Sequence, residues 1–255
     1  MWVEKPPSRK QQLKKEDRGV LADDSEGTVT LDYLNKVKRV ASRISGDHSR
    51  SLGLHPAIYF YGATGKFQPP SLLATVRMIQ EMEQRDSFVK FTGIRQKYEE
   101  FLFKYKHFTN QIVGDYGGGT RGVEPLLEMY SEIQAGLEQS STQEEIVTRL
   151  LSHQNLKRRL KEISEPDRLA GRNFSTETKS AVYLRQAIES APRCGICGAR
   201  VHLRGISVDH IVPKRDGGIG SLDNAQLSHP YCNSGYKEHL TAEAQKLSRG
   251  LPIQE

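Results

Sequence analysis

Residues 194–237 decide the fold of this chain, and they read CGICGARVHLRGISVDHIVPKRDGGIGSLDNAQLSHPYCNSGYK. Each end of this stretch carries two residues of the metal-ligating types, separated by two others. The first pair is Cys194 and Cys197, and the second is His229 and Cys232, about 30 residues further on. Two such pairs predict two tight turns that close around one ion.

Zinc is the ion that these four residues favour, because it takes nitrogen and sulfur ligands in a tetrahedron. Four protein ligands leave no open position, so the predicted site is structural. His202 and His239 are alternative fourth ligands, but neither is two residues from a cysteine. The chain has 3 cysteines, which would leave one unpaired in a disulfide scheme. A redox pair would need a strand-to-helix context that this segment lacks.

The residues between the two pairs predict a small unit of two strands and a helix. Residues 206–211 have β-branched strand character, residues 213–220 form a loop, and residues 225–227 form a second short strand. A helix is expected from Tyr231 onward. The order strand, loop, strand, helix is therefore predicted. We call the two turns that carry the ligand pairs, together with their ion, the zinc knuckle.

Four polar residues occupy fixed places in this unit, and together with the ligand pairs they resemble the HNH, or ββα-metal, endonucleases. In that family an Asp-His pair ends the first strand, an Asn starts the second, and a His or Asn lies on the helix. The matching residues here are Asp209, His210, Asn224 and Asn233. The third position is Asn and not His, as in many HNH enzymes.

The resemblance implies a role for each residue. Asp209 and Asn233 would hold one Mg²⁺ or Mn²⁺ ion through oxygen ligands, which hard cations prefer. His210 would be the general base that takes a proton from the attacking water. Asn224 would fix the loop and backbone behind His210. Three nearby cations are candidates for phosphate contacts, with solvated loop charges as the equal alternative: Lys214, Arg215 and Lys237.

Composition agrees with a globular protein that meets a polyanion. Of the 255 residues 27% are charged and 36% hydrophobic, and the formal net charge is +6. The sequence has no apolar run long enough for a membrane span, and its first 15 residues lack the apolar core of a signal peptide. We therefore expect a cytoplasmic protein without a membrane segment.

The chain divides into four predicted parts, and the expected fold class is α+β. A basic tail (1–28) precedes a mainly helical domain (29–190) that positions DNA or a partner. The zinc-braced HNH module (191–245) and a C-terminal tail (246–255) follow.

Apolar periodicity predicts several helices in the second part. One carries Leu31, Leu34 and Ile44 on its buried face, and another opens at Pro69-Pro70. A stripe from Ile94 to Ile112 predicts one long helix, with a loop over residues 114–122 after it. Ser141 with Glu144 predicts a capping box that opens a later helix.

The upstream part carries a second, broader resemblance. Residues 54–61, LHPAIYFY, and the helices after them are similar to the region before the HNH module in some GmrSD-like restriction proteins. Those proteins have a ParB-related N-terminal nucleotide-binding domain with an Asp-Gly-Gln-Arg type motif, which does not occur here. The chain therefore resembles the rear part of such an architecture.

We therefore expect a metal-dependent endonuclease that cuts DNA to 5′-phosphate and 3′-hydroxyl ends, as a restriction or anti-phage defence enzyme. Its expected partners are DNA and a further restriction or defence subunit or domain. Two alternatives are a non-catalytic zinc-knuckle protein that binds nucleic acid and an RNA-cleaving HNH enzyme. The Asp209 and His210 pair argues against the first, because a pure binder has no use for a metal ligand beside a base. The sequence leaves the second open.

Overall fold

The computed structural model describes residues 24–117, 119–162 and 173–248. The predicted tails lie mainly outside these residues, since 1–23 and 249–255 are not described. Within the described ranges the protein is mostly helical with one small sheet, which confirms the α+β class. No helix among these residues combines the length and the apolar character needed to cross a membrane.

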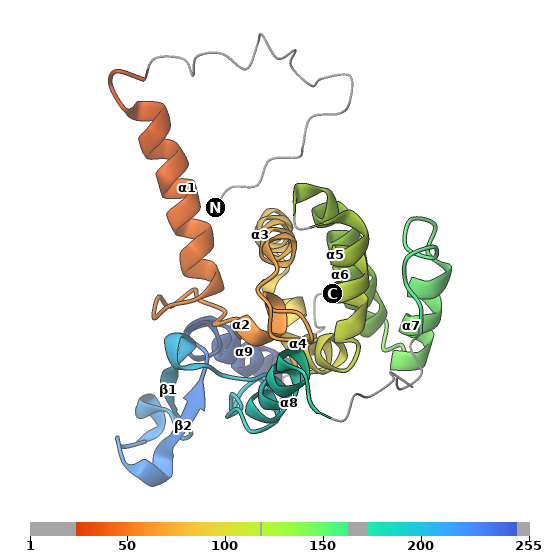
Figure 1. Cartoon of the computed structure of the whole chain (residues 1–255). Helices are drawn as coiled ribbons and strands as arrows, with labels where there is room; N and C mark the ends of the chain where they lie inside the picture. Colours follow the sequence, from red (N-terminus) through yellow and green to blue (C-terminus); the bar gives the residue numbers. More distant parts are fainter. Residues whose placement is uncertain (1–23, 118, 163–172, 249–255) are drawn as a thin grey trace.

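The helical body is built around α6, which packs against both α3 and α4 (Figure 1). Their buried faces meet in a single core that includes Ile79, Phe91, Tyr98, Leu126 and Ile133. The helices of the body are α1 (Thr28–Ile44), α2 (Pro56–Tyr59), α3 (Pro69–Gln84), α4 (Phe88–Lys104), α5 (Lys106–Tyr116), α6 (Val123–Glu138), α7 (Gln143–Ser152) and α8 (Thr176–Glu189).

The apolar stripe from Ile94 to Ile112 is divided between two helices, so the prediction of one helix is wrong. Tyr105 separates α4 from α5 with φ −102° and ψ 33°. Both helices bury their side of the stripe in the same core, so the apolar spacing continues across the break. Periodicity reports the buried face and does not reveal a one-residue break in the backbone.

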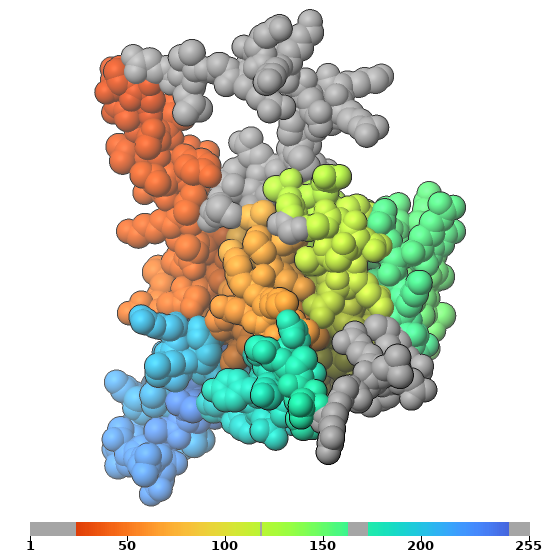
Figure 2. Space-filling view, viewed as in Figure 1, coloured from red at the N-terminus to blue at the C-terminus, as the bar shows by residue number. Residues whose placement is uncertain are grey.

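Three smaller expectations also need correction. Helix α5 runs through Gly114 to Tyr116, so the predicted glycine loop begins later. The capping box that opens α7 is formed by Thr142 and Glu145, one residue after the predicted pair. Leu31 and Leu34 are 60% and 53% exposed, and only the last turns of α1 are buried. In Figure 2 the first part of α1 accordingly stands away from the helical body.

The C-terminal part has the predicted order of two strands and a helix. Strands β1 (Ser207–His210) and β2 (Ala225–Ser228) are antiparallel, with Val208 opposite Leu227 and Asp209 opposite Gln226. A π-helical turn (Cys232–Tyr236) then leads into α9 (Lys237–Ser248). Short 3₁₀ turns complete the connections, at Leu203–Gly205, Lys214–Asp216 and Leu222–Asn224.

A buried ion pair joins the helical body to this C-terminal part. Arg95 and Glu99 of α4 are 0% and 1% exposed, and Arg95 Nε lies 2.8 Å from Glu99 Oε1. The other oxygen of Glu99 accepts a hydrogen bond from the backbone N–H of Arg200 at 2.9 Å. Arg95 also donates to the carbonyl groups of Leu52 and Gly53. Helix α4, the loop before α2 and the residues after Cys197 are thus held by one polar network.

Gly53 fits this junction because its backbone is both left-handed and closely approached. Its φ is +56°, and a Cβ atom there would lie 2.8 Å from the carbonyl oxygen of Gly205 and 3.0 Å from the His229 ring. A side chain at this position would push the loop away from the knuckle. The sequence boundary near residue 190 remains a prediction, and these contacts cross it.

We predict that Glu99→Gln lowers the free energy of unfolding by about 3–5 kcal/mol, because it leaves the Arg95 charge buried without a counter-ion. Glu100→Gln is the matched control: this carboxylate is 36% exposed and lies 3.4 Å from Arg193. Its loss should cost less than about 1 kcal/mol. Chemical denaturation measures both. Equal effects of the two substitutions would contradict the structural role of the buried pair.

Candidate metal centre and neighbouring cleft

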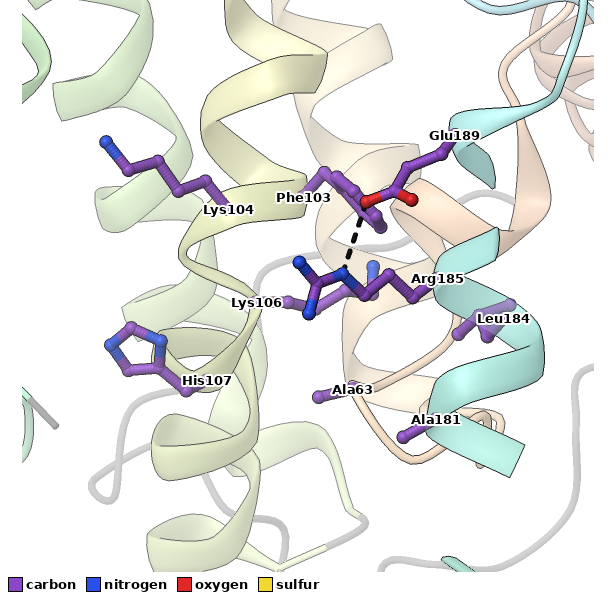
Figure 3. A pocket seen from close by; sticks show the side chains of 9 residues that line it. All are labelled: Ala63, Phe103, Lys104, Lys106, His107, Ala181, Leu184, Arg185 and Glu189. Carbon is purple, nitrogen blue, oxygen red and sulfur yellow. Dashed lines mark hydrogen bonds and ion pairs between the residues drawn. The ribbon is translucent and has the colours of Figure 1, made fainter. Parts of the chain in front are cut away.

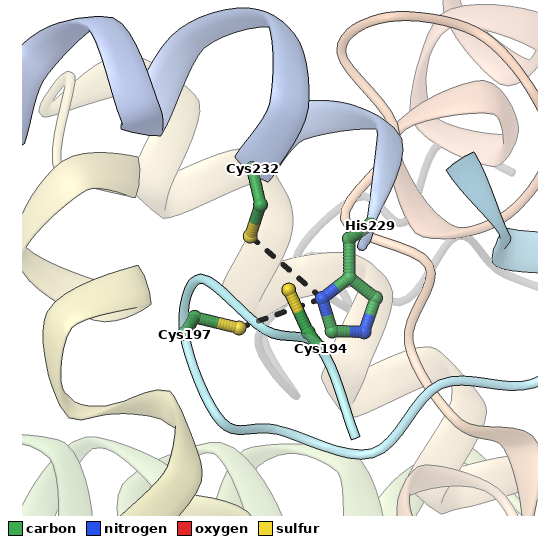
Figure 4. Close-up of side chains that lie close together, drawn as sticks. All are labelled: Cys194, Cys197, His229 and Cys232. Atoms are coloured by element: carbon green, nitrogen blue, oxygen red, sulfur yellow. Dashed lines mark hydrogen bonds between the residues drawn. The ribbon is translucent and has the colours of Figure 1, made fainter. Parts of the chain in front are cut away.

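The two predicted ligand pairs come together at the junction of α4 with the C-terminal part (Figure 4). The three Sγ atoms and the ligand nitrogen of His229 all lie within 4.8 Å of one another. The four residues are Cys194, Cys197, His229 and Cys232. His202 and His239, the rival ligands, are not part of this cluster.

The distances fit a tetrahedral zinc ion. His229 Nδ1 lies 3.5 Å from Cys197 Sγ and 3.7 Å from Cys232 Sγ. Zinc bonds of about 2.3 Å to sulfur and about 2.0 Å to nitrogen give tetrahedral S–N edges of about 3.5 Å. The other nitrogen, His229 Nε2, lies 3.1 Å from the carbonyl oxygen of Arg200. A backbone acceptor on the second nitrogen is the usual way to orient a metal-binding imidazole.

Hydrogen bonds among the sulfurs set the protonation of the cluster when no cation is bound. The sulfurs share hydrogen bonds, and the bond with Cys194, followed by burial, raises the pKa of Cys197 to about 12 even though Cys232 acts in the opposite direction. A dication among these sulfurs would favour the thiolates over the shared protons. The donor set is therefore that of a closed structural zinc site.

Asp209 is the most buried of the predicted catalytic residues, at 4% exposed. Gln226 Nε2 donates to its Oδ2 at 2.8 Å, across the strand pair. Lys237 Nζ lies 2.9 Å from Oδ1 and 2.8 Å from Oδ2, and it also donates to the carbonyl oxygen of His210. The carboxylate is thus fixed from two sides, by β2 and by the first turn of α9.

A cleft of about 260 Å³ opens beside this carboxylate. Asp209, His210 and Asn233 all line it, so β1 and the π-helical turn bring three of the four predicted catalytic residues together. Lys214, Arg215 and Lys237 line the same cleft. The first two belong to the 3₁₀ turn Lys214–Asp216 and are exposed, which fits phosphate contacts and solvated loop charges alike. Lys237 instead has its ammonium group on Asp209.

Asn224 lies behind the cleft. Its Oδ1 accepts a hydrogen bond from the Val212 backbone N–H at 2.7 Å, and its Nδ2 donates to the carbonyl groups of Val212 and Ile219. Its own carbonyl accepts from the Ile211 N–H at 2.9 Å. These bonds hold the segment that directly follows His210, in agreement with the bracing position expected for this asparagine.

Asn233 is held by its amide nitrogen. Nδ2 donates to Ser207 Oγ at 2.8 Å and to the Val208 carbonyl at 3.2 Å. The wide π-helical turn directs Cys232 to the metal cluster and the next residue, Asn233, to the cleft. The side-chain oxygen of Asn233, Oδ1, and the Asp209 carboxylate are the oxygen donors that could hold a hard cation in the cleft.

Sequence reasoning missed Gln226, which connects the knuckle to the cleft. Its amide oxygen packs against Gly195, where an added Cβ would lie only 2.0 Å away. The Gly195 N–H donates to the Leu227 carbonyl at 2.8 Å. The available signal was the strand register: a glutamine directly opposite Asp209 on the same face can reach its carboxylate.

Comparison with known proteins identifies this part of the chain. Residues 194–238 match the family model described as HNH endonuclease, and these residues include both ligand pairs and the cleft side chains named above. No curated protein and no solved structure was found to match the chain. The similarity of the upstream residues to GmrSD-like restriction proteins is not shown by these comparisons and stays a prediction.

We predict one zinc ion per chain, and we predict that Cys232→Ala loses the ion and unfolds or aggregates, because structural zinc contributes folding energy directly. Elemental analysis of purified protein and a thermal melt measure the two effects. Wild-type protein without zinc, or a Cys232→Ala protein that melts like wild type, would contradict the assignment.

Proposed function

We propose that the HNH endonuclease domain at residues 194–238 hydrolyses DNA phosphodiester bonds with the help of a divalent cation, leaving 5′-phosphate and 3′-hydroxyl ends. The observation that carries this proposal is the convergence of Asp209, His210 and Asn233 on one cleft. Metal-assisted hydrolysis needs oxygen ligands for the ion and a group that takes a proton from the attacking water, and these three side chains can supply both. A protein that only bound nucleic acid would not need them together.

The oxygen donors of the cleft fit Mg²⁺ or Mn²⁺. Asp209 and Asn233 would hold the ion, which when bound would polarise the scissile phosphate and offset the negative charge on the leaving oxygen. Lys237 and Gln226 hold the Asp209 carboxylate in place. This is why we treat Lys237 as a positioning residue, a change from its predicted role in phosphate binding.

His210 is the proposed general base. The peptide bond after it is anchored at both polar groups, because the His210 carbonyl accepts from Lys237 and the Ile211 N–H donates to the Asn224 carbonyl. A fixed backbone limits the positions that the imidazole can reach, and a base must lie within hydrogen-bond distance of the water it activates. Asn224 therefore acts on the reaction by holding the segment that carries the base.

The substrate side of the cleft is cationic. Lys214 and Arg215 sit at its rim and are the proposed contacts to the phosphates on either side of the scissile bond. The net charge of +6 adds a general attraction for a polyanion. We also propose a restriction or anti-phage defence role, with a further defence subunit or domain as partner, and this rests on the predicted resemblance of the upstream residues to GmrSD-like proteins.

We predict that His210→Ala slows plasmid cleavage in Mg²⁺ by about 10²- to 10⁴-fold, which is the usual contribution of a general base. Zinc content and thermal stability should stay near wild type, because the side chain is half-buried at the cleft and is not a zinc ligand. A gel assay of supercoiled, nicked and linear plasmid measures the rate.

His239→Ala is the matched control for this variant. His239 lies on α9, pairs with Glu243 at 2.9 Å and does not line the cleft, so its removal should leave the cleavage rate unchanged. Cleavage by His210→Ala at the rate of His239→Ala would contradict the assignment of the base. Cleavage of RNA but not of DNA by the wild type would favour the RNA-cleaving alternative.

A further inference from the structure

A second cavity lies on the helical body, away from the residues of the catalytic cleft. Its volume is about 500 Å³, and it is bounded by the break between α4 and α5 on one side and by α8 on the other (Figure 3). None of its lining residues belongs to the metal cluster or to the proposed nuclease cleft. The size is within the range of pockets that hold small organic ligands, roughly 300–1,000 Å³.

Lys106 is the unusual residue of this cavity. It is 6% exposed, and its Nζ donates to the Ile58 carbonyl. Within the described part of the chain it forms no ion pair, and burial lowers the pKa of Lys106 to about 7. Buried charges are normally paired with an opposite charge, because their transfer from water is costly. An ammonium group has three N–H donors, so the bond to Ile58 leaves two for a ligand.

Further nitrogen-bearing side chains line the same cavity. His107 Nε2 is buried without a hydrogen-bond partner. Lys104 also lines the cavity, and its Nζ donates a hydrogen bond of 2.9 Å to Gln143 Oε1. Arg185 of α8 lines the opposite wall and pairs with Glu189 at 3.2 Å. In Figure 3 the Arg185 guanidinium extends from α8 across the space toward α5. The cavity thus has three side chains of cationic type and one carboxylate.

The same cavity has an apolar wall. Phe103 of α4 and Leu184 of α8 line it from opposite sides. Arg200 does not line the cavity but contacts Phe103: its guanidinium carbon is 5.6 Å from the centre of the ring, and the residue is 6% exposed. Arg200 Nη1 is also buried without a partner. The surroundings therefore suit a ligand that combines an anionic group with a flat or apolar part.

We propose that this cavity binds a small organic phosphomonoester of about mononucleotide size, with its phosphate on Lys106 and Arg185 and its apolar part against Phe103 and Leu184. The phosphate supplies the counter-ion that Lys106 otherwise lacks, and its two negative charges match the excess of cationic groups. This site is independent of the proposed nuclease activity, since it shares no residue with the cleft.

A ligand bound in this cavity would also restrain the helix that leads into the zinc knuckle. Helix α8 ends at Glu189, five residues before Cys194, and the carbonyl group of Ile188 accepts a hydrogen bond from Arg200 Nε. A ligand held between α5 and α8 therefore fixes the helix that leads into the metal cluster. We expect it to raise the melting temperature of the whole protein, as any ligand that binds only the folded state does.

Calorimetric titration of the zinc-loaded, full-length protein tests the proposal with four probes: adenosine monophosphate, phenyl phosphate, adenosine and inorganic phosphate. We expect saturable binding of the two organic phosphates with Kd below about 1 mM, weaker binding of inorganic phosphate and none of adenosine. Binding of phenyl phosphate alone would point to a non-nucleotide ligand of the same chemistry. Absence of binding by both organic phosphates would overturn the proposal.

Lys106→Met tests the position of the phosphate, with Lys97→Met of the exposed face of α4 as the matched control. Lys106→Met should weaken binding at least about tenfold, a change of 1.4 kcal/mol, and should not lower the melting temperature, because it removes an unpaired buried charge. Lys97→Met should bind like wild type. If Lys106→Met does not fold, Arg185→Gln tests the phosphate position instead. Arg185 is 73% exposed, so this variant should fold, and it should bind the organic phosphates severalfold more weakly. Wild-type affinity in the folded variants would overturn the proposal.

Discussion

The buried pair between Arg95 and Glu99 is the constraint on which the rest of the structure depends. Burial alone lowers the pKa of Arg95, but the Glu99 carboxylate, followed by Tyr59 and only then by the sulfurs of Cys197 and Cys232, more than compensates and keeps the pKa above its usual value. A zinc ion held by three thiolates would carry one net negative charge, and the Arg95 guanidinium would offset part of it. The helical body thus contributes a charge to the knuckle as well as a surface.

The knuckle in turn fixes the cleft. His229 and Cys232 lie at the two ends of the short segment between β2 and the π-helical turn, and the Asn233 N–H donates to the His229 carbonyl at 3.0 Å. On the other side, Gly195 packs against Gln226, which holds Asp209. Both proposed ligands of the catalytic ion are therefore attached to residues of the structural zinc site, and their separation depends on it.

The sequence was sufficient to predict the features that repeat a short local pattern. Two ligand pairs with the same spacing predicted the metal cluster, and the strand and loop character of residues 206–231 predicted the ββα unit, which the strands and α9 confirm. The order of Asp209, His210, Asn224 and Asn233 gave the resemblance to the HNH family. The roles of these four residues stay predictions. Local patterns succeed here because a tight turn or a strand end places its side chains without help from distant residues.

The features that sequence reasoning missed depend on distant contacts. Arg95 and Glu99 are four residues apart on a helix, which is the spacing of an ordinary surface ion pair, and only the packing of residues 51–54 and 200 around them makes them buried. Lys106 sits in a helical pattern where a lysine is expected to face water, yet it is buried. Lys237 adjoins the metal motif, but its partner Asp209 is set by the hairpin.

The most direct test of the proposed hydrolysis is to treat plasmid with the zinc-loaded protein, with and without Mg²⁺, and then to add DNA ligase to the purified nicked product. Hydrolysis by the proposed cleft predicts nicks only when Mg²⁺ is present, and the ligase should seal them, because sealing requires a 5′-phosphate beside a 3′-hydroxyl. Cutting with zinc alone, or nicks that ligase cannot seal, would contradict the account.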